Sequence, residues 1–351
     1  LDIPSHEYKT PIRSHSAKIN DVAVDPQRKQ FSTVSDDGSV RVWNFETCEQ
    51  LFQFDLPDQR VCCIAYHPQR PIIACGCSDG LVRVFDISKA SLIQEHKQHA
   101  QDILKVMFHP QGSFMYTGGS EGTICVYDVQ QNYMPMKYLT TSVPSGLICM
   151  AVSPDGRYFA TVGTEQSSVL IFDGVTLTSH AKIFTTVKLV KSIQFSPDSS
   201  EIFIVNVDSD VEVYDIETQK IVKHIPPIPN TDYRAFNIDL IHDRLVLTGG
   251  GDNLIRIWEY VPQDEALLPS QSFAGHVSTI KKIVTTKSEY VISLGDEEGI
   301  YTWKLLPSGG LYDDDEGSDE EQVDEQKFYA SQDAQKLPFS HYKSLNMTNR
   351  T

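Results

Sequence analysis

A repeat of about 43 residues runs through most of this chain and limits the folds that are open to it. Each repeat ends in a short apolar run with an aromatic residue at its third position, and successive aromatic residues are 42 to 45 positions apart. The aromatic positions are Trp43, Phe85, Tyr127, Phe172, Tyr214, Trp258 and Trp303. A period of this length indicates a supersecondary unit that buries its apolar surface only against neighbouring copies.

Two ladders of turn residues have the same period as the aromatic ladder. One consists of Asp25-Pro26, His67-Pro68, His109-Pro110, Ser153-Pro154 and Ser196-Pro197. The other precedes the aromatic run and contains Gly38, Gly80 and Gly122. Since Pro and Gly favour tight reversals and the flanking residues alternate between apolar and polar, each turn is expected to join two strands. The aromatic run is expected to form a third strand, and a later segment such as residues 50–54 a fourth. Each repeat is therefore predicted to contain four strands.

These ladders resemble the WD40 repeat, which forms one four-stranded blade of a β-propeller. The resemblance extends from about Glu7 to Leu306. It implies an all-β fold in which residues 7–306 form a seven-bladed WD40 β-propeller and residues 307–351 form a tail or linker.

The two ends of the repeat region predict how the ring closes. The seventh aromatic strand is followed by Pro307, and the sequence supplies no outer strand after it. The segment from Glu7 to Arg13 precedes the first repeat and is expected to fill that place. A blade that contains both ends of the domain leaves no sheet edge free.

The resemblance also assigns structural roles to polar residues. In WD40 proteins a His between blades, a Ser or Thr on the second strand, an acid in the next turn and the aromatic residue form a hydrogen-bonded chain. The matching residues are His15, Thr33, Asp37 and Trp43 in the first repeat, His99, Thr117, Glu121 and Tyr127 in the third, and His276, Ser293, Glu297 and Trp303 in the seventh. Other repeats depart from this pattern, for example with Cys75 at the hydroxyl position and Gln166 at the acid position.

Propellers carry function in the loops that connect their blades, because a rigid framework positions those loops. By analogy with the family, residues beside the starts of the inner strands face one side of the ring and are candidates for protein binding. They are Lys18, Arg60, Asp102, Lys188, Tyr233 and Arg234. The alternative is that these residues are solvated loop ends. The proline-rich connection 225–234 is equally compatible with a docking ledge and with a packed loop between blades.

The charge of the chain is concentrated in one segment. The 351 residues include 30 Lys+Arg and 47 Asp+Glu, which gives a formal net charge of −17. Nine acids lie between Tyr312 and Glu325, so the other 337 residues carry −8. Like charges repel, so a flexible acidic tail is expected, and an electrostatic contact with a basic partner, strengthened by phosphorylation of Ser318, is a second hypothesis. The acidic balance argues against direct binding of nucleic acid.

No residue pattern in the chain is typical of a catalytic, cofactor-binding or metal site. Neither Cys62-Cys63 nor Cys75-Gly76-Cys77 has a second ligand pair at a zinc spacing. Asp208-Ser209-Asp210 fits a hairpin turn better than half a cation site. Gly249-Gly250-Gly251 precedes a strand and therefore lacks the helix terminus that binds phosphate. We expect neither enzymatic activity nor a cofactor.

Cellular location is constrained by the cysteines and by the hydropathy of the chain. Seven cysteines in apolar strand-like runs are typical of buried free thiols in a reducing compartment. No stretch approaches the about 20 apolar residues that span a bilayer. The first residue is Leu1, so we expect the sequence to be part of a longer chain or complex. A cytoplasmic or cytoskeletal location without membrane contact follows.

Several segments of the repeats, taken together, resemble a narrower class of WD-repeat protein. Segments 52–54, 65–71, 80–85, 275–276 and 300–303 look similar to multi-propeller, microtubule-associated WD-repeat proteins of centrioles and cilia. The resemblance implies a non-catalytic scaffold for protein interactions, with tubulin or ciliary and centriolar proteins as partners. The alternative hypothesis is a nuclear or ubiquitin-ligase subunit that recognises a substrate or a basic histone peptide in an acidic central pocket.

Overall fold

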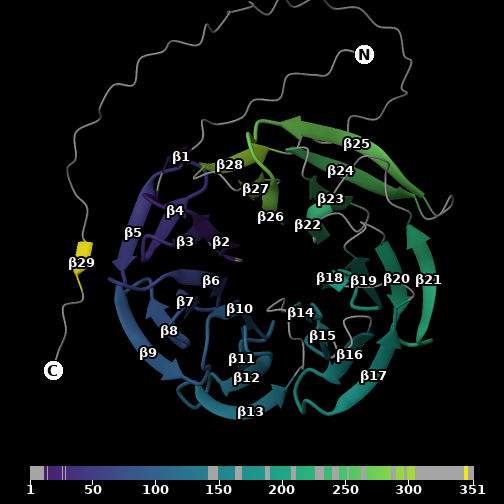
Figure 1. Cartoon of the computed structure of the whole chain (residues 1–351), viewed down its shortest axis with the longest axis horizontal. Helices are drawn as coiled ribbons and strands as arrows, with labels where there is room; N and C mark the ends of the chain where they lie inside the picture. Colours follow the sequence, from purple (N-terminus) through teal and green to yellow (C-terminus); the bar gives the residue numbers. More distant parts are fainter. Residues whose placement is uncertain are drawn as a thin grey trace, which may run out of the picture.

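The computed structural model describes residues 12–13, 15–25, 27, 29–140, 149–162, 168–185, 190–206, 211–225, 233–238, 245–250, 253–261, 266–285, 290–295, 299–304 and 344–346. Within these residues every regular element is a β-strand. No helix in this part of the chain is long and apolar enough to cross a membrane. The all-β class and the propeller architecture are confirmed, because the strands form sheets arranged around a common centre (Figure 1).

The described strands form seven sheets, six of them antiparallel throughout, which we number blades 1 to 7 in the order of their innermost strands. The inner strands are β2 (Ile19–Val24), β6 (Val61–Tyr66), β10 (Ile103–Phe108), β14 (Met150–Val152), β18 (Val190–Phe195), β22 (Tyr233–Ile238) and β26 (Ile280–Thr285). The second strands are β3 (Gln30–Ser35), β7 (Ile72–Cys77), β11 (Phe114–Gly119), β15 (Tyr158–Val162), β19 (Glu201–Asn206), β23 (Leu245–Gly250) and β27 (Tyr290–Gly295).

The third and fourth strands of each blade follow in the same order from the centre outward (Figure 1). The third strands, which contain the aromatic ladder, are β4 (Ser39–Asn44), β8 (Leu81–Asp86), β12 (Thr123–Asp128), β16 (Ser168–Asp173), β20 (Val211–Asp215), β24 (Leu254–Val261) and β28 (Gly299–Lys304). The outer strands are β5 (Gln50–Asp55), β9 (Ser91–Lys97), β13 (Met134–Thr140), β17 (Ser179–Phe184), β21 (Lys220–Ile225), β25 (Ala266–Ala274) and, in blade 7, β1 (Ile12–Arg13).

Blade 7 joins strands from the two ends of the repeat region. The strand β1 pairs antiparallel with β28, with Ile12 opposite Ile300 and Arg13 opposite Gly299. The expected closing strand is therefore present at residues 12–13, whereas residues 7–11 lie outside the described residues. This pairing covers the edge of β28, which would otherwise present unpaired backbone groups.

The inner strands share a β-bulge near their first residue. Six of them shift register between their first and third residues, so one extra residue enters the strand. The extra residues are Asn20, Cys62, Leu104, Lys191, Arg234 and Lys281. A bulge increases local twist and redirects the residues that follow it. In these six strands the bulge therefore sets which positions occupy equivalent places in the ring.

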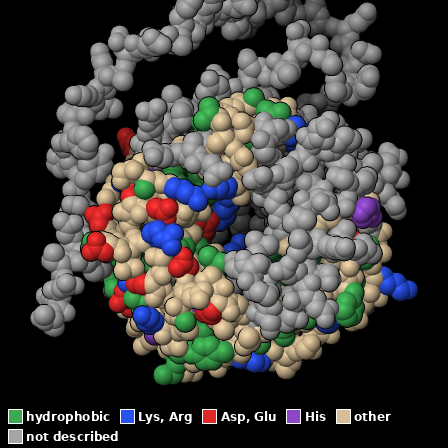
Figure 2. Space-filling model, viewed as in Figure 1, with side chains coloured by type: hydrophobic (Ala, Val, Ile, Leu, Met, Phe, Trp, Pro, Cys, Tyr) green, Lys and Arg blue, Asp and Glu red, His purple; other side chains and the backbone are tan. Residues whose placement is uncertain are grey.

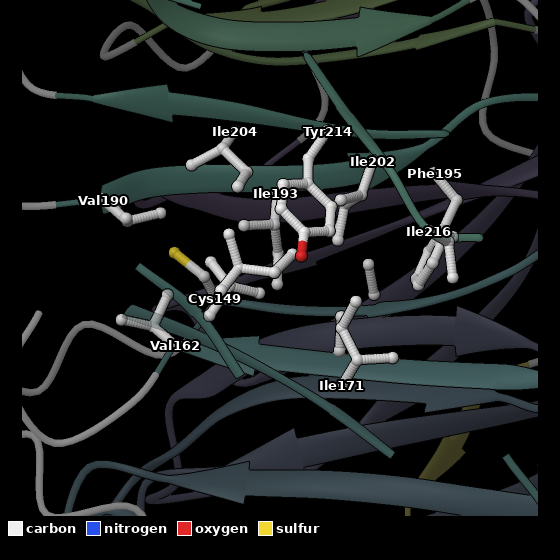
Figure 3. Close-up of a cluster of buried hydrophobic side chains, with 14 residues drawn as sticks. Cys149, Val162, Ile171, Val190, Ile193, Phe195, Ile202, Ile204, Tyr214 and Ile216 are labelled. Carbon is white, nitrogen blue, oxygen red and sulfur yellow. The ribbon is translucent and has the colours of Figure 1, made fainter. Parts of the chain in front are cut away.

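The hydrophobic core lies between neighbouring blades. Figure 3 shows the cluster between blades 4 and 5, where Val162 and Ile171 of blade 4 pack against Ile193 and Ile204 of blade 5. Equivalent clusters join blades 1 and 2, 2 and 3, 3 and 4, 6 and 7, and 7 and 1. Since the sheets of blades 1 to 4 and 7 each bury both faces against neighbouring sheets, these blades gain most of their hydrophobic stabilisation from their neighbours.

The segment after residue 304 contributes one further strand to the described structure. Residues Ser344–Asn346 form β29, which pairs parallel with the outer edge of β5. The expectation of a flexible tail did not include this strand. The acidic run 312–325 lies outside the described residues.

Candidate protein-interaction face

One side of the ring is built from two sets of loops, which we call the loop face. In blades 1 to 3 it comprises the segments before the inner strands and the hairpin turns between the second and third strands, namely residues 15–18, 36–38, 58–60, 78–80, 98–102 and 120–122. The same backbone hydrogen bond joins the two sets in each of these blades: Asp36 N–H donates to Lys18 O (2.9 Å), Ser78 N–H to Arg60 O (3.0 Å) and Ser120 N–H to Asp102 O (2.8 Å). The repeat therefore gives the loop face a fixed backbone.

The glycine ladder is part of this construction. Gly80 has a φ of +76°, and a Cβ atom at this position would lie 2.2 Å from the carbonyl oxygen of His99 in the next loop. Only glycine combines the left-handed backbone with so close an approach. The turn of blade 2 thus packs directly against the segment that enters blade 3.

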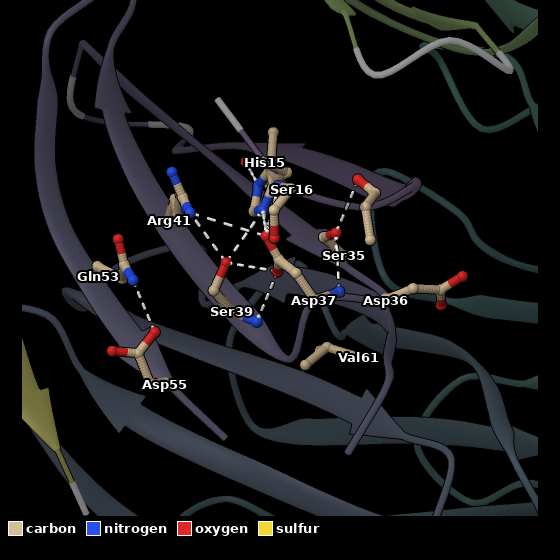
Figure 4. Close-up of polar contacts among 12 residues, drawn as sticks. His15, Ser16, Ser35, Asp36, Asp37, Ser39, Arg41, Gln53, Asp55 and Val61 are labelled. Atoms are coloured by element: carbon tan, nitrogen blue, oxygen red, sulfur yellow. Dashed lines mark hydrogen bonds and ion pairs between the residues drawn. The ribbon is translucent and has the colours of Figure 1, made fainter. Parts of the chain in front are cut away.

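In blade 1 the structure brings together the four polar residues assigned by the resemblance (Figure 4). The Nδ1 and Nε2 atoms of His15 lie 3.0 Å from Asp37 Oδ2 and 2.8 Å from Thr33 Oγ1. The indole N–H of Trp43 donates to Thr33 Oγ1 (2.9 Å). Three of these residues are buried and Asp37 is half-buried, so the chain of hydrogen bonds replaces water inside the blade.

The protonation of this chain follows from its surroundings. Burial lowers the pKa of His15, although Asp37 opposes the shift. Burial alone would raise the pKa of Asp37, but hydrogen bonds from His15 and Ser39 outweigh it and hold that pKa well below its ordinary value. A neutral His15 therefore donates from Nδ1 to the ionised Asp37 and accepts the Thr33 hydroxyl proton at Nε2. Every donor then has an acceptor.

Blade 3 forms part of the expected chain. His99 contacts Glu121 Oε1 through Nδ1 (2.6 Å) and Thr117 Oγ1 through Nε2 (2.7 Å). The hydroxyl of Tyr127 is buried and has no hydrogen-bond partner, so the chain ends at Thr117. A phenol carries its polar atom farther from the backbone than an indole N–H does, which is why this ring does not reproduce the tryptophan contact.

Blade 7 repeats the contacts among His, hydroxyl and Trp that are found in blade 1. The Nε2 atom of His276 lies 2.7 Å from Ser293 Oγ, which also accepts the indole N–H of Trp303 (2.8 Å). Glu297, which was assigned the acidic position, lies outside the described residues.

Of the six residues predicted to bind a partner, the structure describes the side chains of three and brings two of them into contact. Arg60 and Asp102 come from the loops before β6 and β10 and form an ion pair of 2.8 Å across blades 2 and 3, with side chains that are 56% and 35% exposed. Lys18 is exposed on the loop before β2. Tyr233 and Arg234 are the first two residues of β22, where the structure describes the backbone only. Lys188 lies outside the described residues.

The structure shows a further set of residues that sequence reasoning missed, which we call the inner ring. In six inner strands the residue directly after the bulge pairs with the corresponding residue of the second strand, so these six residues occupy equivalent places in their blades. The members are Asp21, Cys63, Lys105, Cys149, Ser192, Ala235 and Lys282. Cys149 belongs to this set because it directly precedes β14 and its carbonyl accepts the N–H of Val162 (3.4 Å). The signal in the sequence was the period itself, since Asp21, Cys63 and Lys105 are each 42 residues apart.

Three members of the inner ring are ionisable at neutral pH and come from blades 7, 1 and 3. Lys282 forms an ion pair with Asp21 Oδ1. The other carboxylate oxygen of Asp21 accepts the backbone N–H of Ile64 in blade 2 (3.0 Å). Asp21 thus links three consecutive blades. Lys105 is half-buried and forms no hydrogen bond or ion pair among the described residues.

Comparison with known proteins assigns the family. Residues 23–304 match the family described as WDR90/POC16, second beta-propeller. The match starts in β2 and ends with the last residue of β28, so it includes all of blades 2 to 6 and most of blades 1 and 7. The chain belongs to the WDR90/POC16 family.

Named relatives of this WDR90/POC16 propeller include centriolar and ciliary proteins. Centriole proteome protein 16 from Chlamydomonas reinhardtii is 34% identical over 182 residues, which are 49% of this chain and 9% of that protein. WD repeat-containing protein 90 from Mus musculus is 28% identical over 326 residues, 87% of this chain and 17% of that protein. Cilia- and flagella-associated protein 52 from Chlamydomonas reinhardtii is 24% identical over 159 residues, 45% of this chain and 23% of that protein. The chain therefore spans a small part of the length of these relatives.

The cysteines of the WDR90/POC16 propeller are all free. Five are buried, and Cys48 and Cys62 are half-buried, so the expectation of uniformly buried thiols is wrong for these two. Burial, with a smaller contribution from Asp102, raises the pKa of Cys62 to about 12, which keeps this thiol protonated at neutral pH. Among the described residues no group of three or more His, Cys, Asp or Glu side chains could hold a metal ion.

Proposed function

We propose that the chain is a non-catalytic protein-interaction scaffold within a centriolar or ciliary assembly, built as a closed ring of seven blades. The observation that carries this proposal is the match of the ring from residue 23 to residue 304 to the second propeller of the WDR90/POC16 family. The names of two relatives refer to centrioles, cilia and flagella, which supports a cytoskeletal location.

The geometry of the loop face supports a role in binding proteins. Its backbone is held by the repeated hydrogen bonds between loops, so little conformational entropy remains to be lost on binding. Arg60 and Lys18 present exposed cationic side chains on this face, and Arg is enriched at the energetically important centres of protein interfaces. We propose tubulin or neighbouring centriolar and ciliary proteins as the partners.

The localisation of the tagged chain in ciliated cells, measured with proximity labelling, tests this proposal. We expect enrichment at centrioles or cilia, and we expect Lys18→Glu combined with Arg60→Glu to reduce it. The matched control is Lys29→Glu combined with Lys89→Glu, which reverses two exposed lysines in turns on the opposite side of the ring. A diffuse distribution of the unmodified chain would refute the proposal.

Microtubule co-sedimentation at moderate salt tests direct binding to tubulin. The unmodified chain and a variant with the nine acids of residues 312–325 replaced by amides are compared. Pelleting of either chain supports tubulin as a partner. Absence of pelleting for both chains would eliminate direct microtubule binding and leave the neighbouring proteins.

The alternative hypothesis of a histone-peptide or substrate reader requires an acidic centre. The described inner ring carries Lys105 and Lys282 against one acid, Asp21, and therefore does not favour a basic ligand. We retain the scaffold as the proposed function.

A further inference from the structure

Both carboxylate oxygens of Asp21, in the inner ring, have partners within the protein. Asp21 Oδ1 accepts the backbone N–H of Val22 (2.9 Å) and pairs with Lys282, while Oδ2 accepts the backbone N–H of Ile64 (3.0 Å). The side chain of Asp21 is only 10% exposed. Asp21 therefore balances the charge of Lys282 and holds blades 7, 1 and 2 in register.

Lys105 is the second cation among the described side chains of the same ring. It is half-buried in β10 and has no hydrogen-bond or ion-pair partner among the described residues. Desolvation lowers the pKa of Lys105, Lys282 shifts it in the same direction, and Asp21 opposes them. A desolvated ammonium group without a partner is unfavourable, and a carboxylate placed beside it would remove much of that cost.

A further basic residue lies beside this ring, toward the loop face. The bulge residue lies one position nearer the loop face than the inner-ring residue of the same strand. In blade 7 the bulge residue is Lys281, whose side chain is half-buried. Figure 2 shows Lys and Arg side chains, with Asp and Glu side chains among them, on one side of the hollow at the centre of the ring. A positive potential focused in a concave site attracts anionic ligands.

We propose that the centre of the ring, entered from the loop face, binds an acidic peptide segment of a partner protein, with an Asp or Glu carboxylate of that segment meeting the Lys105 ammonium. This inference deepens the proposed scaffold function by naming the chemistry of its partner. A peptide is favoured over a nucleic acid because one recessed lysine suits a single projecting carboxylate. A long polyanion would also have to lie along a surface whose residues, outside the acidic run 312–325, carry a net charge of −8.

The test uses the full 351-residue chain and a fluorescent ten-residue peptide of alternating Glu and Gly. Binding is measured by anisotropy, with a peptide of alternating Gln and Gly as the uncharged comparison. The same titration is repeated with the nine acids of residues 312–325 replaced by amides, which removes competition from the chain's own acidic run. We expect the Glu peptide to bind and the Gln peptide to bind at least about tenfold more weakly.

Variants at Lys105 identify the site. Lys105→Met should weaken binding of the Glu peptide by about tenfold or more, and Lys105→Arg should restore much of it. Lys89→Met is the matched control, because its side chain is 75% exposed in the turn after β8 on the opposite side of the ring. Thermal melting of each variant confirms that the fold is intact. In NMR spectra, the pKa of Lys105 should rise when the Glu peptide is bound.

Several outcomes would overturn the inference. Equal binding of the Glu and Gln peptides, unchanged affinity in a folded Lys105→Met variant, or no binding to either form of the chain would each do so. Tighter, Lys105-dependent binding of a single-stranded oligonucleotide would refute the peptide as the partner class. A failed peptide titration with normal centriolar localisation would refute this inference alone and leave the proposed function in place.

Discussion

A single buried hydroxyl organises the interior of blade 1. Thr33 Oγ1 accepts the Trp43 indole N–H and donates to Nε2 of His15, so it satisfies two buried groups from separate strands and loops. Ser293 has the same double role between His276 and Trp303 in blade 7. A residue of this kind is costly to replace by an apolar one, because both partners lose their hydrogen bonds inside the protein.

We predict that Thr33→Val lowers the free energy of unfolding by about 2 to 3 kcal/mol, since it leaves the His15 ring nitrogen and the Trp43 N–H unsatisfied. Thr33→Ser keeps the hydroxyl and removes one methyl group, so it should cost about 1 kcal/mol or less. Urea unfolding of the two variants measures the difference. Equal losses in the two variants would show that packing of the methyl group, and not the hydroxyl, is important here.

The lowered pKa of His15 predicts a pH dependence of stability. Because the folded pKa lies below the ordinary value of 6.5, the unfolded chain binds more protons, and stability falls as the pH drops through 6.5 toward the folded pKa. The slope is at most about 1.4 kcal/mol per pH unit for one histidine. Urea midpoints between pH 7.5 and 5.5 should decrease, and His15→Gln should reduce that decrease.

His67 has a pKa that burial also lowers, so some pH dependence should remain in the His15→Gln variant. His180→Gln is the control, because this residue is exposed. An unchanged slope in His15→Gln would contradict the assignment of the effect to blade 1.

Neighbouring blades are joined by contacts that the turn ladders provide. The His of each His-Pro turn reaches the following blade: His67 Nε2 lies 3.2 Å from Gly112 O, and His109 Nε2 lies 2.9 Å from Gly156 O. The imidazole of His109 also occupies the space beside Gly156 that a Cβ atom would need. These turns therefore do more than reverse the chain, since they fix the spacing between sheets.

A double-mutant cycle tests this contact between blades 3 and 4. Gly156 has a φ of +77°, and a Cβ atom there would lie 2.5 Å from the His109 ring, so Gly156→Ala should destabilise the protein by about 2 kcal/mol. Combining it with His109→Ala removes the clash, so the two losses should fall short of additivity by about 1 kcal/mol. Strict additivity in thermal or urea unfolding would show that the ring does not restrict this turn.

The short strand β1 predicts the effect of opening the ring. Deleting residues 1–13 removes β1 and exposes the edge of β28, whereas deleting residues 1–6 leaves both strands of that pair. We expect the longer deletion to lower Tm by at least about 2 °C and to increase aggregation. Differential scanning calorimetry and light scattering measure both effects. Identical Tm values for the two truncated chains would contradict a closing role for β1.

The blades of the ring are expected to depend on one another for stability, because the described hydrophobic clusters lie between neighbouring sheets. Each described cluster draws residues from two adjacent blades, as Figure 3 shows for blades 4 and 5. Loss of packing in one gap therefore weakens two sheets, and we expect the blades to unfold together.

The three tryptophans allow this cooperativity to be measured at a distance. Trp43, Trp258 and Trp303 lie in blades 1, 6 and 7, whereas Ile171 is fully buried between blades 4 and 5. We predict that Ile171→Ala destabilises the protein by about 3 kcal/mol and shifts the tryptophan-fluorescence and circular-dichroism transitions equally. Val175→Ala, at a 54% exposed site in the same blade, should cost less than about 0.5 kcal/mol. Separate transitions for the two signals would indicate independent unfolding of the blades.

Much of the blade structure could be predicted from the sequence because it depends on residues close together in the chain. The turns at Gly38 and Gly80, the aromatic strands and the His15–Thr33–Trp43 contacts all lie within one repeat or at its boundary. The missing tryptophan contact in blade 3 was not predicted, because it depends on how far the Tyr127 hydroxyl reaches within a packed sheet.

The order of residues alone establishes the repeating unit, the all-β class and the concentration of acidic charge outside the repeats. These properties can be predicted because the strands and turns depend on residues that are close together in the sequence. It does not establish which repeats meet at the centre. Lys105 and Lys282 are separated by most of the ring in sequence and are brought to one inner ring with Asp21 when the blades close. That neighbourhood arises from ring geometry and from a bulge repeated in the inner strands, which is why the candidate anion site is visible only in the folded protein.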